Sequence, residues 1–177
     1  MKKSIFISIL VVVSMVSCIN VTETTQKDVL TKNIETHENK YFSEEQYQAK
    51  RADLDSMIVL YSEFTDKYND DSLTVFYMYK KANLFTATQD YKSAIKTYDK
   101  ICKNYPDFID RPKALFFQAM IYGDNLKNEV LAEQKYNEFI ADYPNHELRD
   151  DAEKSIEFLG KTDAEIIEML TQNDTIK

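Results

Sequence analysis

The chain has 177 residues, with 22 Lys and Arg against 30 Asp and Glu, which gives a formal net charge of −8 at pH 7. An acidic surface repels phosphate backbones, so this charge argues against nucleic acid as a partner. It also excludes charge attraction as the means of holding the chain at an anionic membrane. The two glycines and three prolines suit a helical protein and provide no glycine-rich loop for a phosphate group.

Residues 1–17 are expected to be a signal peptide. Two lysines precede an apolar run of 12 residues, Ile5 to Val16, and a bilayer-spanning helix needs about 20. The sequence Met-Val-Ser-Cys at 15–18 then resembles the lipobox of bacterial lipoproteins, in which the peptide is cut before an acylated cysteine. We therefore expect lipidation at Cys18. An ordinary secretory signal is the alternative, and either reading predicts export.

Residues 18–42 are expected to form a lipidated, flexible tether. They carry five threonines and scattered charges, and they show no sustained apolar period. About 24 flexible residues have a root-mean-square reach of about 25 to 30 Å. A short helix near Val29 to Ile34 is the alternative for part of this segment. At the other end, residues 171–177 are expected to be a disordered tail.

Residues 43–170 are predicted to be helical. No stretch alternates with a period of two, which argues against a sheet, and Ser43 with Gln46 has capping-box spacing. Pro112 stands where a first helical turn tolerates proline, while Pro106 and Pro144 follow helix ends. The predicted helices cover Ser43 to Tyr68, Leu73 to Thr88, Tyr91 to Tyr105, Pro112 to Gly123, Val130 to Tyr143, Glu147 to Leu159 and Asp163 to Leu170.

An aromatic motif recurs three times within this region, at steps of 37 and 38 residues. Its copies are Tyr61, Phe64, Tyr68; Tyr98, Ile101, Tyr105; and Tyr136, Phe139, Tyr143. Ala94 and Pro106 are matched by Ala132 and Pro144, 38 residues later. A fixed period in this range predicts stacked repeats, in which each helical pair buries its apolar face against the next.

The pattern resembles the tetratricopeptide repeat, with a small residue in the second helix, an aromatic residue four positions on and a proline twelve positions on. The resemblance implies an all-α fold, a right-handed solenoid of helical hairpins over 43–170 with C-terminal capping helices. The polar residues Lys154 and Glu157 fit such a cap. Gly123 stands where the family has an aromatic residue, which leaves the packing of that turn open.

The long repeat and the lipobox together look like envelope lipoproteins of the outer-membrane β-barrel assembly type and like the periplasmic coordinator of the Tol-Pal system. The closing stretch, Leu159 to Glu165, is similar to the tail of short tetratricopeptide lipoproteins of Bacteroidetes. The resemblance implies a location at the outer membrane, facing the periplasm, because no aspartate of the retention type follows Cys18.

The residues that carry chemistry are sparse, so we expect no enzyme activity, no cofactor and no metal. No second His or Cys lies three or four positions from His37 or His146. The carboxylate pairs, such as Asp70 with Asp71, stand at turns or first helical turns, where negative charge complements the helix dipole. Cys102 lies within a repeat helix and is expected to be a buried, unreactive thiol.

We expect a non-enzymatic, monomeric scaffold that binds an envelope protein or peptide on its concave face. By repeat geometry, the first helix of each pair lines that face, which gives Phe76, Tyr79, Asn83, Thr86, Phe117, Ile121 and Asn125. Packing against the N-terminal helix is the competing role for several of these side chains. The alternative functions are a glycan- or peptidoglycan-binding lipoprotein, through stacking tyrosines, and a small hydrolase with an unrecognised site.

Overall fold

In the computed structural model of the chain, residues 25–41 and 50–174 are described. These residues form helices and turns, and none of them lies in a strand, which confirms the predicted all-α helical-repeat fold. The chain divides into two compact units, one up to Tyr77 and one from Met78 onward.

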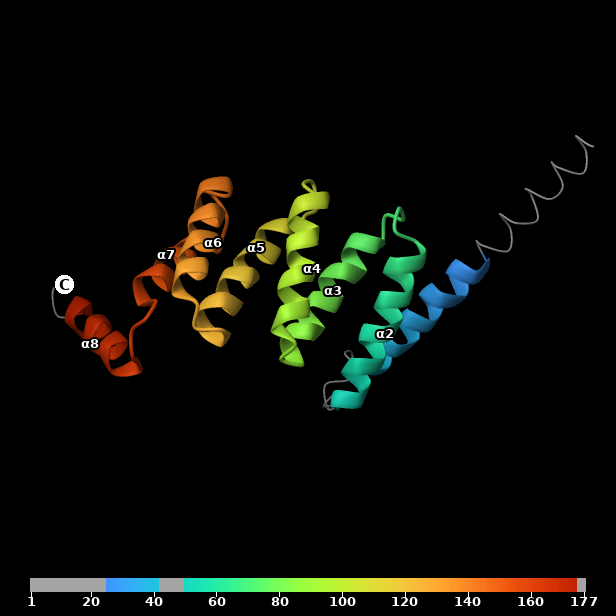
Figure 1. Cartoon of the computed structure of the whole chain (residues 1–177), viewed down its shortest axis with the longest axis horizontal. Helices are drawn as coiled ribbons and strands as arrows, with labels where there is room; N and C mark the ends of the chain where they lie inside the picture. The colour runs from blue at the N-terminus through green and yellow to red at the C-terminus, as the bar shows by residue number, and fades with distance from the viewer. Residues whose placement is uncertain (1–24, 42–49, 175–177) are drawn as a thin grey trace, which may run out of the picture. The chain divides into compact units, whose positions relative to one another are not determined.

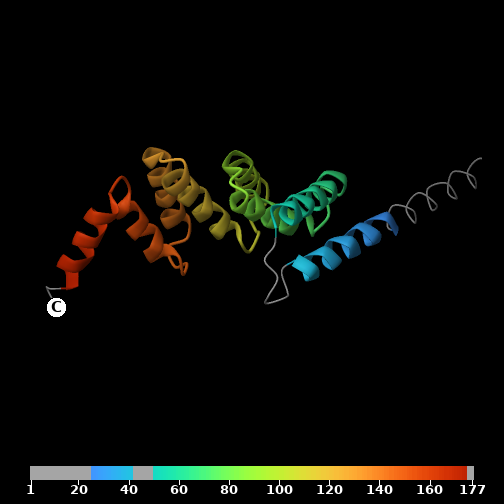
Figure 2. The same cartoon turned by 90° about the horizontal axis from the view of Figure 1, so that it is seen from below.

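The first unit contains a helix over residues 25–41, helix α2 (Arg51–Lys67) and the first turn of α3 (Thr74–Ala87). The helix over 25–41 packs along α2 (Figure 2). The Tyr61 hydroxyl donates to the Glu38 carboxylate over 2.7 Å, and the Lys67 ammonium donates to the Gln26 amide oxygen over 2.9 Å. Lys27 forms an ion pair of 2.8 Å with Asp71.

The expectation of a flexible tether over 18–42 is therefore wrong for residues 25–41. Leu30, Ile34 and Tyr41 are 7%, 0% and 8% exposed, so one face of this helix is buried. The residues are spaced four and seven apart, which is the helical period. Charged residues between these three positions masked the pattern in the sequence.

Helix α2 begins at Arg51 rather than at the predicted Ser43. Lys50 is not helical, and its backbone N–H donates to the Asp53 carboxylate over 2.9 Å, which satisfies one of the open donors of the first turn. The predicted cap, Ser43 with Gln46, lies outside the described residues.

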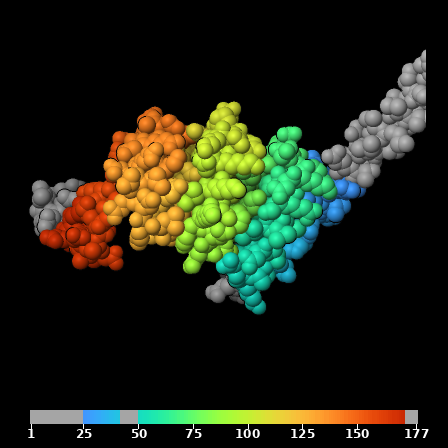
Figure 3. Space-filling model, viewed as in Figure 1, coloured from blue at the N-terminus to red at the C-terminus, as the bar shows by residue number. Residues whose placement is uncertain are grey.

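The second unit stacks its helices in chain order (Figures 1 and 3). After α3 come α4 (Tyr91–Asn104), α5 (Arg111–Met120), the π-helix η1 (Ile121–Asn125), α6 (Glu129–Asp142), α7 (Arg149–Phe158) and α8 (Asp163–Asp174). Helix α5 packs against both α4 and α6, and α6 packs against α7. Most bounds agree with the prediction to within two residues. Helix α8 continues to Asp174, so residues 171–174 are helical and not part of a disordered tail.

Every copy of the aromatic motif ends its helix in the same way. Tyr68, Tyr105 and Tyr143 have φ of −122°, −129° and −131°, and each donates its N–H to the carbonyl four residues back over 2.9 to 3.0 Å. Two further hydrogen-bonded turns then follow in each copy. The residue three positions after the tyrosine donates its N–H to the tyrosine carbonyl, and its own carbonyl accepts from the first residue of the next helix. The same backbone geometry therefore recurs with each copy of the sequence motif.

The core of the second unit is built from the motif residues. Ile101, Phe139 and Ala132 are fully buried, and Tyr136 is 2% exposed. The ring of Phe116 packs edge-on against those of Tyr136 and Phe139, with centroids 5.5 and 5.7 Å apart. Such pairs add about 0.5 to 1.5 kcal/mol each beyond the area that they bury.

Arg111 joins two successive repeats of the second unit. Its Nε donates to the Cys102 carbonyl over 3.0 Å, its guanidinium donates to the Tyr143 hydroxyl, and it lies 3.8 Å from the Asp142 carboxylate. It therefore satisfies a carbonyl in the last turn of α4, where orphan acceptors need partners, and it connects that turn to the end of α6.

The turn at Gly123 widens into the π-helix η1, in which Leu126 N–H donates to the Ile121 carbonyl over 3.0 Å. A Cβ on Gly123 would lie 3.0 Å from the Leu159 side chain and 3.4 Å from the Ala132 Cβ. The aromatic residue that the repeat pattern expects here has no space, since α6 and the end of α7 occupy it. This geometry resolves the question that the sequence left open at that turn.

Helix α8 begins with a capping box. Thr162 N–H and its hydroxyl both donate to the Glu165 carboxylate, over 2.8 and 2.7 Å. Along α8, Ile167 and Leu170 are 61% and 50% exposed, so this helix leaves apolar surface uncovered at the end of the stack. Among the helices of the described ranges, none is long and apolar enough to cross a membrane.

Candidate partner-binding face

The structure gathers three of the predicted residues around one buried hydroxyl. Tyr98 is 1% exposed, and its hydroxyl donates to the Asn83 amide oxygen over 2.5 Å. Tyr79, which is half-buried, also reaches Asn83 with its hydroxyl, and Thr86 lies within hydrogen-bonding reach of Tyr98. Burial raises the pKa of both phenols, so they are neutral donors across the physiological pH range.

Aromatic rings surround this polar cluster. The Tyr79 ring packs edge-on against Tyr98 and Phe108, with centroids 6.2 and 5.8 Å apart. The Phe117 ring also packs against the Tyr98 ring, with centroids 6.1 Å apart. Tyr79, Asn83, Thr86 and Phe117 all keep part of their surface accessible. They combine apolar rings with amide and hydroxyl groups, a mixture that can hold a peptide by contact and by hydrogen bonds.

The other three predicted residues do not join this cluster. Ile121 is fully buried, because η1 packs against both α4 and α6, so it cannot contact a partner and its assignment was wrong. Asn125 is exposed and donates to the Tyr91 hydroxyl over 3.1 Å. Phe76 belongs to the first unit and is 44% exposed.

The histidines have structural roles. His37 Nδ1 lies 2.8 Å from the Asn33 carbonyl, a contact that requires its proton on Nδ1. His146 Nδ1 accepts from Leu148 N–H over 3.1 Å, and the ring packs on Phe139 at 5.4 Å. The first imidazole thus closes a helical turn, and the second fixes the start of α7. Within residues 25–41 and 50–174, no three His, Cys, Asp or Glu side chains are placed to hold a metal ion.

Cys102 is a partly buried thiol without a disulfide. Burial raises its pKa to about 11, against the opposing effect of the Arg111 guanidinium. A thiol with this pKa is almost entirely protonated at neutral pH, and the protonated form is a poor nucleophile. The lipidation site predicted at Cys18 lies outside the described residues.

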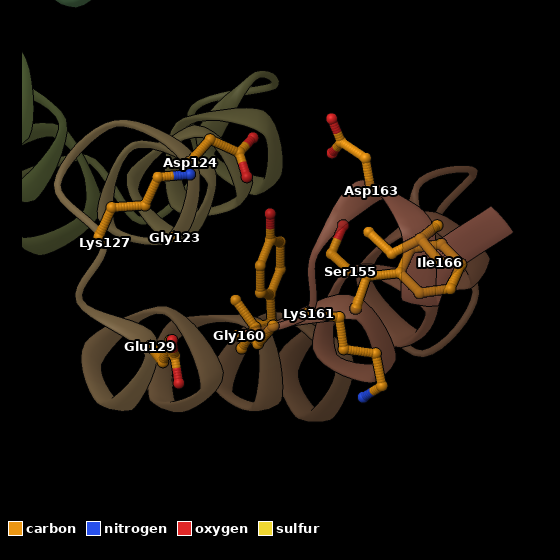
Figure 4. A pocket seen from close by; sticks show the side chains of 12 residues that line it. Gly123, Asp124, Lys127, Glu129, Ser155, Gly160, Lys161, Asp163 and Ile166 are labelled. Carbon is orange, nitrogen blue, oxygen red and sulfur yellow. The ribbon is translucent and has the colours of Figure 1, made fainter. Parts of the chain in front are cut away.

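A cavity of about 480 Å³ lies at the C-terminal end of the second unit, and the sequence analysis did not anticipate it. It is enclosed by η1, α6, α7, α8 and the turn between the last two helices (Figure 4). Both glycines of the chain, Gly123 and Gly160, line it. The sequence contains only two glycines, and they stand at two turns 37 residues apart. This spacing was the one sequence feature that could have pointed to the cavity.

A comparison with protein families identifies the repeat. Residues 77–107 match the tetratricopeptide repeat family. The match begins at the end of the first turn of α3 and extends through α4 and the tyrosine turn that follows it. Tetratricopeptide repeats generally mediate contacts between proteins, and this match supports a chain built on them. No curated protein matches the chain.

Proposed function

We propose that the chain is a lipid-anchored scaffold of the bacterial cell envelope whose helical repeats bind another protein. The observation that carries the proposal is the repeated tyrosine turn, found three times with one backbone geometry and matching the tetratricopeptide repeat in residues 77–107. A framework that repeats in this way holds its accessible side chains rigidly, and rigid presentation lowers the entropic cost of binding.

The proposed binding face of the second unit consists of Tyr79, Asn83, Thr86, Phe117 and Asn125, and Phe76 of the first unit is proposed as a further binding residue. Its partner would be an extended or helical segment with apolar anchors, because partly exposed aromatic rings alternate there with amide and hydroxyl groups. Attachment through Cys18 would raise the local concentration of the scaffold at the membrane. The periplasmic face of the outer membrane and a monomeric state are parts of the same proposal.

A tagged pull-down from gently solubilised envelopes tests the protein-binding role. Phe76→Glu is the informative variant because the ring is 44% exposed, whereas truncating Tyr79 or Phe117 would also remove packing on Tyr98. Ile109→Glu is the matched control, since Ile109 is 79% exposed and is not one of the proposed binding residues. We expect a protein captured by the native chain and by the control to be lost with Phe76→Glu.

Capture that is unchanged in Phe76→Glu would place the binding site elsewhere. Retention on purified peptidoglycan, with no protein captured, would contradict the scaffold and support the glycan-binding alternative. The anchor is tested separately by Cys18→Ala, which should release the chain from the membrane fraction. A Cys18→Ala chain that still sediments with membranes would contradict lipid attachment.

A further inference from the structure

The exposed part of the lining of the cavity at the C-terminal end of the second unit includes the carboxylates of Asp124 and Asp163. Asp124 comes from η1, and Asp163 comes from the first turn of α8. Figure 4 shows both carboxylates on the same side of the cavity, while the ammonium of Lys161 points away from them. Both aspartates are exposed, and within the described part of the chain neither forms an ion pair. No Lys, Arg or His nitrogen of the described residues therefore lies within ion-pair distance of either carboxylate.

The interior of the cavity supplies hydroxyl groups and apolar surface. Tyr136 is 2% exposed, and its hydroxyl bonds to that of Ser155. Burial and the nearby Asp124 charge raise the pKa of the Tyr136 phenol, so it stays a neutral hydrogen-bonding group. Phe158 and Ile166 add half-buried apolar surface to the lining. The cavity thus combines hydroxyl groups and apolar surface inside with three carboxylates and two lysines among its exposed lining residues.

A basic side chain has the complementary distribution of properties. Lysine and arginine combine an apolar stem with a cationic head, and the stem packs on apolar surface while the head meets carboxylates. A cationic head that lies over the face of an aromatic ring adds a favourable cation–π contact. The size also fits, because about 480 Å³ lies within the usual range of about 300 to 1,000 Å³ for binding pockets.

Lys127 is the competing cation, because it also lines the cavity and extends beside Asp124 in Figure 4. Its side chain is exposed, so it can move aside without a large loss of packing. The net charge of the chain is −8, which adds a long-range attraction for a basic partner. An anionic ligand would be repelled by the Asp124 and Asp163 carboxylates and by the net negative charge of the chain.

We propose that this cavity is a binding subsite for a lysine or arginine side chain of a basic segment in the partner protein. The proposal rests on the protein-binding function proposed above and adds to it a site outside the predicted face. The shape of the cavity depends on its two glycines. Gly160 has φ of +72°, and a Cβ there would lie 2.8 Å from the Glu129 carboxylate. Side chains at Gly123 and Gly160 would fill space or distort the turns that shape the cavity.

The glycines also provide a selective measurement. With ¹⁵N-glycine labelling, the full chain gives two amide signals, one from each glycine, and both report on the cavity. The probes are the acetylated, amidated peptide Gly-Ser-Arg-Ser-Gly and its counterpart with glutamine in place of arginine. We expect the arginine peptide to shift both signals in a saturable way and the glutamine peptide to leave them unchanged.

Substitutions of the lining aspartates then identify the carboxylates. Asp124→Asn and Asp163→Asn should each weaken binding of the arginine peptide about two- to five-fold, the range for ion pairs near a surface. Asp150→Asn with Asp151→Asn is the matched control, because these exposed carboxylates begin α7 and do not line the cavity. The control should bind like the native chain.

Equal shifts with both peptides, no shift with either, or unchanged binding in the Asp124 and Asp163 variants would each overturn the proposal. The positions of the two glycine signals without peptide show whether a variant keeps the native turns. If the pull-down captures a partner that Phe76→Glu loses while the arginine peptide fails to bind, only the subsite is wrong. If neither experiment detects binding, the scaffold function is wrong as well.

Discussion

The helix over residues 25–41 should contribute measurably to the stability of the first unit, and replacing Ile34 with alanine tests this. The Ile34 side chain is 0% exposed, and its truncation removes three buried carbon atoms. At about 0.8 kcal/mol for each, the lost transfer free energy is about 2.4 kcal/mol. A residual cavity adds to this, so we expect the free energy of unfolding to fall by about 2 to 4 kcal/mol.

The same helix offers a matched control at Val29, which is 65% exposed. Both substitutions replace a β-branched residue with alanine and gain a similar, small helix propensity. Val29→Ala should therefore change the free energy of unfolding by no more than about 0.5 kcal/mol. The difference between the two changes in unfolding free energy therefore measures the contribution of burying the Ile34 side chain.

Denaturant unfolding followed by circular dichroism measures both values, and hydrogen exchange of the amides in 25–41 shows where stability is lost. Protection in this segment should fall in Ile34→Ala and remain in Val29→Ala. Equal stabilities for the two variants, with rapid exchange of these amides in the native chain, would refute the packed helix. The flexible tether expected from the sequence would then be correct.

Three further predictions concern the second unit. Arg111→Ala removes the hydrogen bonds of a mostly buried guanidinium and should lower the free energy of unfolding by about 1 to 3 kcal/mol in a denaturant titration. Lys113→Ala, which removes a more exposed ion pair with Asp110, should have a much smaller effect. Equal losses in the two variants would contradict the connecting role of the arginine. The rise of the Cys102 pKa from 9.0 to about 11 lowers its thiolate fraction about 100-fold at pH 8. Alkylation by iodoacetamide, measured with the other cysteine replaced by serine, should therefore be clearly slower than in the unfolded chain and should accelerate as pH rises toward 11. Similar rates at pH 8 would show an accessible thiol. Gly160→Ala places a side chain at φ of +72° and should lower the free energy of unfolding by about 1 to 2 kcal/mol. Adding Glu129→Ala should recover only the part of this loss that comes from the clash between the new Cβ and the Glu129 carboxylate. Full recovery would exclude backbone strain.

The repeat was the part of the fold that the sequence predicted best. Tyr98, Ile101 and Tyr105 recur with a fixed period because each repeat must end its helix and fill the same gap between neighbours. The N-terminal helix was expected only as a short alternative near Val29 to Ile34, because its buried positions are few and are separated by charged residues. Periodicity is a weak signal when only three side chains carry it.

The candidate site shows a different limit of the sequence. Spacing placed Tyr79 and Asn83 together correctly, but it could not show that the Tyr98 hydroxyl, from the next helix, would bond to the amide. It also assigned Ile121 to an accessible face, because a regular α-helical register does not anticipate the π-helix at 121–125. The cavity was missed since its lining comes from four helices and the turn before α8, and their arrangement depends on tertiary packing.

Site-specific photo-crosslinking in living cells tests the central claim, that the repeats bind a protein, most directly. A photoreactive phenylalanine analogue replaces Phe76, a proposed binding residue that is 44% exposed, or Ile109, which is 79% exposed and is not one of the proposed residues. The account predicts a discrete crosslinked species from position 76 and none from position 109. No crosslinked protein at position 76, or the same products from both positions, would contradict it.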